Sequence, residues 1–183
     1  MDSAKRGRGR QHLVMAELEG ISDQLAAIAE LDHLLTQHRL PYWLFGGWAV
    51  DFHVGRVTRE HTDIDIAVWL GDCPRLAALL SDAAWSHRPE VGEDGYTCYH
   101  RRGVRLEIAF LARDANGHIY TPLETGRGEW PQDTFGTAVA RLNDVQACLV
   151  NRESLVMDKS VARADPETSA KDRSDVANLL RRT

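Results

Sequence analysis

The sequence predicts an α+β fold in which a mixed β-sheet is flanked by helices and followed by a small helical C-terminal part. Residues 12–38 carry apolar side chains at helical spacing, whereas residues 42–45 and 63–68 have the composition and alternation of strands. Two further apolar stretches, 96–101 and 104–111, meet at Arg102-Gly103 as the arms of a β-hairpin would. This mixture of helix and strand patterns is typical of an α+β protein.

The N-terminal part is expected to contain a tail and one long helix. Residues 1–11 are basic and lack apolar periodicity, so we expect a disordered tail. In residues 12–38 the apolar positions recur at spacings of three and four: Val14, Leu18, Ile21, Leu25, Ile28, Leu31 and Leu35. Pro41 then stops the helix. The stripe is expected to pack on the sheet, although a dimer contact is an alternative.

A strand, a glycine pair and a second strand follow. The wholly apolar residues 42–45 are stopped by Gly46-Gly47, and residues 48–54 predict one or two helical turns before a polar loop. In the second strand Ile64, Ile66 and Val68 alternate with Asp63, Asp65 and Ala67. The aspartates are therefore expected to point to one face, opposite the isoleucines.

The remaining elements are assigned from similar patterns. The pattern predicts helices at 74–85, 152–160 and 170–182, a strand at 145–150, a turn at Asn116-Gly117 and a loop over 120–137. We expect one main domain over residues 12–142 and a small C-terminal extension of strand and helices over residues 143–183.

The composition restricts the possible partners and location. The chain has 27 acidic and 22 basic residues, and its arginines are scattered, so a nucleic-acid partner is not expected. Three widely spaced cysteines argue against a disulfide framework and for a reducing compartment. No apolar stretch approaches the roughly 18 residues of a membrane helix. We therefore expect a cytoplasmic protein without a membrane partner, either a monomer or a homodimer.

The two aspartates at the start of the second strand need a counter-charge. Two carboxylates on one face, a few ångströms apart, repel unless a cation lies between them, and hard oxygen ligands suit Mg²⁺. Asp63 and Asp65 therefore predict a divalent-metal site. The alternative is an exposed edge strand, on which two aspartates require no metal.

The glycine pair predicts a phosphate site. Gly46 and Gly47 would let backbone N–H groups approach a ligand without hindrance from Cβ, and a helix starting there would favour an anion. An ordinary strand-to-helix turn is the alternative. Triphosphate on this turn and Mg²⁺ on the aspartates would complement each other.

A third carboxylate lies within the apolar stretch VRLEIAFLA. Glu107 is expected in a strand beside the aspartates, as a ligand of a second metal ion or as a general base. A salt bridge is the alternative, because three arginines are near in the sequence: Arg101, Arg102 and Arg105.

The run GGWAVD followed by TREHTDIDI resembles the nucleotidyltransferase superfamily of the polymerase-beta type. Within it the chain is most similar to the aminoglycoside 2''-O-adenylyltransferase and lincosamide nucleotidyltransferase families. The resemblance implies a nucleotidyltransferase-type sheet and transfer of a nucleoside monophosphate, AMP from ATP by preference, to a hydroxyl of a small molecule, with release of pyrophosphate. An aminoglycoside is the first expected acceptor and a lincosamide the second.

The resemblance also assigns roles to residues. Asp63, Asp65 and Glu107 would bind two Mg²⁺ ions and carry the catalysis, and the nucleotide contacts would be Gly46, Gly47, Arg59, His61 and Lys171. Close relatives usually carry aspartate where this chain has Glu107. The extra methylene moves the carboxylate by about one C–C bond, which affects the expected identity of the acceptor more than the expected reaction.

Acceptor recognition is predicted from loop residues. A polyamine sugar needs carboxylates and a stacking surface, for which the candidates are Glu93, Asp94, Glu124 and Trp130. Other functions remain open: a toxin that modifies a macromolecule, an inactive nucleotide-binding module, or a glycosyltransferase, which would need more strands before the aspartates.

Overall fold

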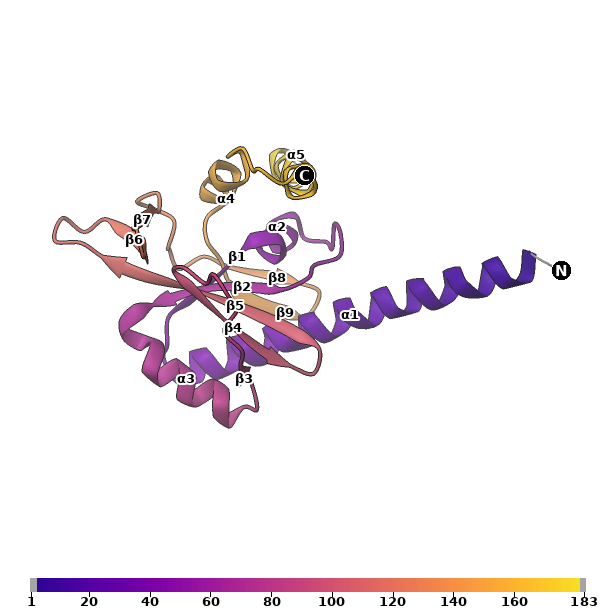
Figure 1. Ribbon diagram of the computed structural model, residues 1–183, viewed down its shortest axis with the longest axis horizontal. Coiled ribbons are helices and arrows are strands. Elements are labelled where there is room, and N and C mark those ends of the chain that lie inside the picture. Colours follow the sequence, from indigo (N-terminus) through magenta and orange to yellow (C-terminus); the bar gives the residue numbers. More distant parts are fainter. Residues whose placement is uncertain (1–2, 182–183) are drawn as a thin grey trace.

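A mixed β-sheet forms the centre of the computed structural model, which describes residues 3–181, with side chains described from residue 19 onward (Figure 1). Its main path runs β1-β2-β5-β4-β3, and β6 and β7 extend it from the end of β5. The strands are β1 Tyr42–Phe45, β2 Ile64–Trp69, β3 Ser86–His87, β4 Tyr96–Arg101, β5 Val104–Arg113, β6 Ile119–Leu123 and β7 Gly126–Glu129.

Strand β2 lies inside the sheet, between β1 and β5. It pairs antiparallel with β1 and parallel with β5, whereas β5 and β4 form the predicted antiparallel hairpin. Ile64, Ile66 and Val68 are almost completely buried, as their alternation predicted. The α+β class and the mixed sheet are therefore confirmed.

Helices lie on both sides of the sheet. Figure 1 shows α3 and the C-terminal half of α1 on one side, and α2, α4 and α5 on the other. The helices are α1 Ser3–Gln37, α2 Gly46–Val54, α3 Cys73–Asp82, α4 Arg152–Lys159 and α5 Pro166–Leu180, with a short 3-10 helix at Leu70–Asp72. The apolar stripe of α1 is buried from Leu25 to Leu35, which supports packing on its own chain. None of the helices within residues 3–181 is long and apolar enough to cross a membrane.

Two predicted boundaries at the ends of the chain were wrong. Helix α1 starts at Ser3, so residues 3–11 are helical rather than a disordered tail, while residues 1 and 2 lie outside the described part. Residues 3–11 contain no proline, and their arginine, lysine, alanine and glutamine residues, which favour helix, outnumber the two glycines, which oppose it. Helix α5 starts at Pro166 because Asp165 caps it, accepting a hydrogen bond from the Thr168 N–H at 2.7 Å.

The segment expected to be a loop, 120–137, contains most of β6 and all of β7. Its glycines and threonines do not give the apolar alternation from which strands are predicted. The backbone of the β6–β7 hairpin nevertheless pairs from Tyr120↔Glu129 to Leu123↔Gly126. A second hairpin follows, formed by β8 Val139–Leu142 and β9 Val145–Cys148. The expected domain boundary at residues 142/143 falls at the turn of this hairpin.

Candidate active site

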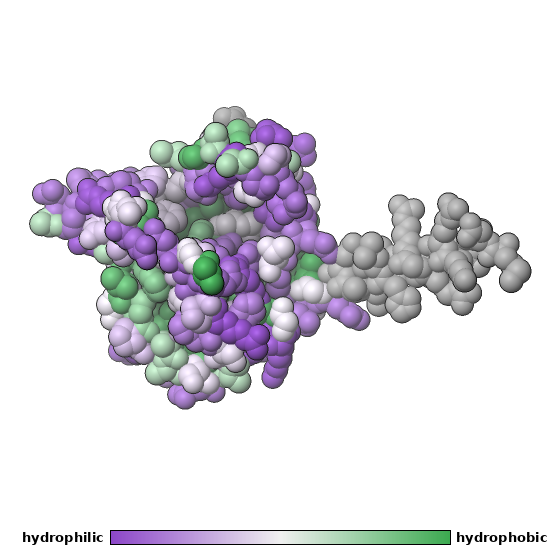
Figure 2. All heavy atoms as spheres, in the orientation of Figure 1, coloured by the Kyte–Doolittle hydropathy of each residue, from purple (hydrophilic) through white to green (hydrophobic). Residues whose placement is uncertain are grey.

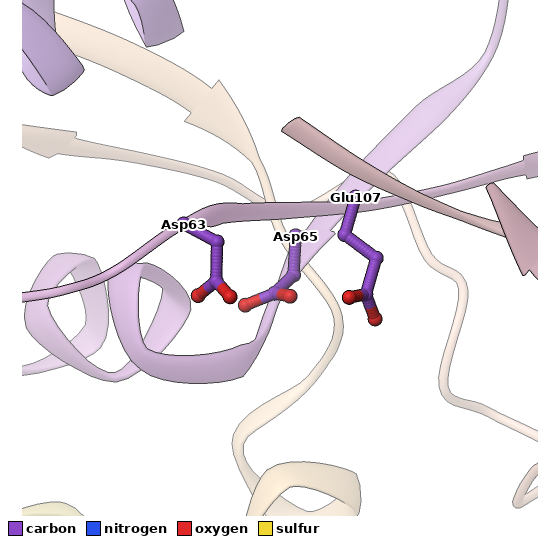
Figure 3. Close-up of side chains that lie close together, drawn as sticks. All are labelled: Asp63, Asp65 and Glu107. Carbon is purple, nitrogen blue, oxygen red and sulfur yellow. The ribbon is translucent and has the colours of Figure 1, made fainter. Parts of the chain in front are cut away.

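Three carboxylates converge on one face of the sheet, at the N-terminal ends of β2 and β5. Asp65 and Glu107 are register partners in the parallel pair, and Asp63 directly precedes β2. One carboxylate oxygen from each lies within 4.8 Å of the others. Figure 3 shows the three side chains pointing the same way, with Asp65 in the middle. The structure therefore brings together the three acids that the sequence singled out.

Gly46 lies directly against this acid cluster, which consists of Asp63, Asp65 and Glu107. Its φ is +64°, and a Cβ atom built on it would lie 1.9 Å from Oδ2 of Asp65. Glycine is required at this position for two reasons: the backbone is left-handed, and there is no space for a Cβ atom. Because α2 begins at Gly46, the first N–H groups of this helix lie beside the carboxylates.

Arg59 and His61 support the second glycine of the turn. A Cβ atom on Gly47 would lie 2.4 Å from Nδ1 of His61 and 2.6 Å from Nη2 of Arg59. His61 is buried, with its Nε2 2.6 Å from Oδ2 of Asp51, and Arg59 Nη1 lies 3.0 Å from its Nδ1. Both predicted nucleotide contacts therefore lie at the glycine turn.

Lys171, by contrast, is half-exposed on α5 and pairs with Glu167 one helical turn away, at 2.9 Å. The buried lysine of this region is Lys159, which sequence reasoning did not select. Its Nζ lies 2.8 Å from Oδ2 of Asp175 and 3.1 Å from Oδ1 of Asp172. Only the spacing of these two aspartates on one face of α5 could have indicated a buried cation.

The same ion-pair network connects α5 to the glycine turn. Arg59 donates to both carboxylate oxygens of Asp175, at 3.2 and 3.0 Å. Burial raises the pKa of Asp175, but the hydrogen bonds from Arg59 and Lys159 outweigh it and leave the pKa below its ordinary value. The C-terminal helix thus fixes the position of Arg59.

Arg105 contacts the acid cluster from β5. Its Nη1 donates to Oδ2 of Asp63 at 2.7 Å and its Nη2 to Oε2 of Glu107 at 3.0 Å. Glu90 binds the other edge of the guanidinium, at 3.1 and 3.2 Å. The salt bridge considered as the alternative for Glu107 is therefore present together with the acid cluster.

The electrostatics of the acid cluster favour a cation. Burial raises the pKa of Asp65 well above its ordinary value, and the charges of Asp63 and Glu107 raise it further. Burial likewise raises the pKa of Glu107, while Arg105 opposes the change. The oxygen ligands and their spacing fit a divalent ion such as Mg²⁺, which would relieve this repulsion.

A cleft of about 550 Å³ opens beside Trp130. Its walls are the β6–β7 hairpin and α4, and Figure 2 shows the hollow between the hairpin at the left and the helices at the top. Phe45 is the register partner of Asp65, and its ring lies edge-on to Trp130 with centroids 5.8 Å apart. The lining residues include Thr121, Glu129, Trp130, Pro131, Ser154, Met157, Asp158 and Val161.

The other predicted acceptor residues do not join Trp130. Glu93, Asp94 and Glu124 line a separate cleft of about 530 Å³, together with Ile108 and Phe110. These two β5 residues alternate with Glu107, so they face the other side of the sheet. Glu93 also accepts hydrogen bonds from the N–H groups of Glu90 and Cys98, which gives it a part in holding the loop.

The chain is similar to known proteins in both sequence and fold. Residues 27–179 match the family model described as aminoglycoside-2''-adenylyltransferase. Two proteins named 2''-aminoglycoside nucleotidyltransferase, from Klebsiella pneumoniae and Escherichia coli, are 44% identical over 126 residues. Each match covers 64% of this chain and 64% of the relative, so the chain spans less than two thirds of the length of these relatives.

Two solved structures share the fold. ANT(2'')-Ia in complex with adenylyl-2''-tobramycin superposes with a TM-score of 0.67 at 20% identity, over 86% of this chain and 87% of that one. The lincosamide antibiotic adenylyltransferase LnuA with lincomycin bound gives a TM-score of 0.63 at 23% identity, over 80% and 90%. The nucleotidyltransferase-type fold implied by the sequence is thereby confirmed.

Proposed function

Because the chain belongs to the aminoglycoside-2''-adenylyltransferase family, we propose that it transfers AMP from ATP to a hydroxyl group of an aminoglycoside and releases pyrophosphate. The observation that carries this proposal is the acid cluster beside the glycine turn. Asp63, Asp65 and Glu107 offer metal ligands within 4.8 Å of one another, directly against Gly46.

The acid cluster would hold the divalent ions, two Mg²⁺ ions in this proposal, with all three carboxylates as ligands. When bound, such ions neutralise phosphate charge and polarise the reacting phosphoryl group. The burial of Asp65 and its place between two other carboxylates support this assignment, because they create the strongest demand for a cation in the cluster.

The glycine turn would bind the triphosphate. The first N–H groups of α2, from Gly46 and Gly47, would donate to phosphate oxygens, and the helix N-terminus adds favourable potential. Arg59, held in place by Asp175, would bind a phosphate oxygen through its positive charge. His61 would support the turn by packing against Gly47. Lys171 could reach a phosphate only after leaving Glu167. Lys159 is bound to Asp172 and Asp175, and its charge lowers the pKa of Asp65, so it would contribute positive potential at the site from a fixed position.

Glu107 would act as the general base in addition to its ligand role. The hydroxyl oxygen of the acceptor attacks the α-phosphorus as its proton passes to the Glu107 carboxylate. A new P–O bond forms, and the bond to pyrophosphate breaks. The position of Glu107 supports this role, because one of its carboxylate oxygens lies within 4.8 Å of the other two acids and could therefore reach a hydroxyl at the same centre.

The cleft beside Trp130 is the proposed acceptor site. Glu129 and Asp158 present carboxylates there that are paired with Arg127 and Arg163. Exposed ion pairs contribute only about 0–1 kcal/mol, so the ammonium groups of an aminoglycoside could replace the arginines. Trp130 offers a face for stacking on a sugar ring.

A lincosamide is the second candidate acceptor. Much of the cleft is apolar, through Trp130, Pro131, Met157 and Val161, and the fold is shared with a lincosamide adenylyltransferase. The glutamate at position 107 supports an acceptor that sits differently from those of the close relatives.

We retain residues 12–142 as the part that holds the acid cluster and the glycine turn. Residues 143–183 remain an extension, which braces Arg59 through α5 and forms one wall of the acceptor cleft through α4. The acid cluster, glycine turn and cleft come from a single chain, so a monomer would suffice, with a homodimer as the alternative. A cytoplasmic location, where ATP is available, accompanies the proposal.

A product assay tests the function. The purified protein is incubated with Mg²⁺, each NTP in turn and a panel of aminoglycosides and lincosamides, and products are identified by mass spectrometry. We expect an adenylylated aminoglycoside with equimolar pyrophosphate, and no product from the Asp63→Asn variant. Pyrophosphate release without a modified drug would instead indicate a macromolecular acceptor, and no reaction would indicate an inactive nucleotide-binding module.

A further inference from the structure

Arg105 occupies an unexpected place for a cation. It lies two residues before Glu107 on the same face of β5, and its guanidinium spans the two outer carboxylates of the acid cluster, those of Asp63 and Glu107. Its side chain is 21% exposed, so these hydrogen bonds are partly shielded from water. The metal-binding face thus already contains a positive charge.

The guanidinium is divided between two anionic partners. Nε and Nη2 donate to the two carboxylate oxygens of Glu90, while Nη1 and Nη2 donate to the acid cluster. Glu90 lies in the exposed loop between β3 and β4 and is outside the cluster. Arg105 can therefore leave the cluster without losing every anionic partner.

A divalent ion on all three carboxylates would conflict with this arrangement. The ion and the guanidinium would share the carboxylates of Asp63 and Glu107, and two cations a few ångströms apart repel each other. Of the two, the guanidinium has the alternative partner.

We propose that Arg105 is a placeholder cation, which neutralises the acid cluster in the metal-free protein and withdraws toward Glu90 when a divalent ion binds. This inference rests on the proposed metal role of Asp63, Asp65 and Glu107. Its consequence is that Arg105 lowers the affinity for the metal while stabilising the protein without it. A role in orienting the carboxylates would have the opposite effect, because loss of an orienting residue weakens metal binding.

Binding of Mn²⁺ to the nucleotide-free protein tests the proposal, with free Mn²⁺ measured by electron paramagnetic resonance. We expect Arg105→Gln to bind Mn²⁺ about tenfold more tightly than wild type, which corresponds to about 1.4 kcal/mol. Arg102→Gln, the same charge change at the exposed hairpin turn, should alter the affinity by about twofold at most, because solvent screens it. Glu90→Gln should weaken binding, since it removes the alternative partner.

Thermal unfolding provides a second measurement that does not depend on activity. Without metal, Arg105→Gln should unfold at a lower temperature than wild type, and saturating Mn²⁺ should raise its Tm by more than it raises that of wild type. Arg105→Lys keeps the positive charge but lacks the planar guanidinium that binds two carboxylates at once. Its Mn²⁺ affinity should therefore lie between those of wild type and Arg105→Gln. This variant also provides a test if Arg105→Gln folds poorly.

The outcomes separate the inference from the proposed function. Equal or weaker Mn²⁺ binding by Arg105→Gln, with binding by wild type and none by Asp65→Asn, would overturn the placeholder role and leave the metal site standing. If wild type binds no Mn²⁺, or Asp65→Asn binds it equally well, the metal role of the cluster is wrong and the placeholder role is wrong with it.

Discussion

Replacement of Gly46 by alanine should damage the active site far more than it damages the fold. The new Cβ atom would lie 1.9 Å from Oδ2 and 2.7 Å from Cγ of Asp65. Because carbon–oxygen contacts outside hydrogen bonds are seldom shorter than about 3.3 Å, the carboxylate must move by more than about 1 Å. The substitution therefore displaces the central acid of the cluster without removing it.

The magnitude has two parts. Alanine in the left-handed conformation of residue 46 costs about 1–2 kcal/mol of stability. A displacement near 1 Å of a catalytic group costs on the order of a hundredfold in rate. We expect Gly46→Ala to reduce kcat at least about a hundredfold, and to lower the affinity for Mn²⁺ as well.

Gly55 provides the matched control at the other end of α2. Its φ is +76°, but a Cβ atom there would meet nothing within 4 Å. Gly55→Ala should therefore lose a similar amount of stability in urea denaturation and keep its turnover in the product assay. Near wild-type kcat for Gly46→Ala, or an equal loss of kcat in both variants, would refute the role given to the contact with Asp65.

Three further changes have distinct expected results. Lys159→Met should lower the free energy of unfolding by about 1–3 kcal/mol, because it removes the buried partner that Asp172 and Asp175 share and leaves them only Arg163 and Arg59. Lys171→Met on the exposed face should cost about 0.5 kcal/mol at most in the same urea titration. Asp65→Asn should make the metal-free protein at least as stable as wild type at pH 7. The wild-type carboxyl, with its raised pKa, costs stability as the pH rises from its ordinary pKa of 3.8 through the raised one, so the variant should lack this component in pH-dependent thermal unfolding. Glu107→Gln should reduce kcat by about 10²–10⁴-fold because it removes the base, and should also weaken MgATP binding in a titration because it removes a metal ligand. Weaker binding with kcat retained at saturating ATP would contradict the role as base.

The central strands and the acid cluster could be predicted because local patterns determine them. Alternation along β2 places Asp65 opposite the buried isoleucines, and the glycine pair marks the start of α2. Parallel pairing of β2 with β5 was the only step needed to bring Glu107 beside Asp65. These residues are therefore readable from a single sequence.

The remaining parts of the site depend on contacts that no local pattern encodes. Nothing in the sequence around Lys159 distinguishes it from other lysines. Its role follows from the tertiary contact with Asp175 on α5. Glu93 and Trp130 have similar loop surroundings in the sequence, but the fold sends them to clefts on opposite faces of the sheet. The β6–β7 hairpin was missed because its residues are held by backbone pairing rather than by apolar alternation.

A crystal structure with Mn²⁺ and a non-hydrolysable ATP analogue, in which anomalous scattering locates the metal, would test the proposed metal and nucleotide sites most directly. We expect anomalous peaks bonded to the carboxylates of Asp63, Asp65 and Glu107, with the triphosphate on the N–H groups of Gly46 and Gly47. Metal bound elsewhere, or nucleotide bound away from the glycine turn with the three carboxylates free of metal, would contradict it.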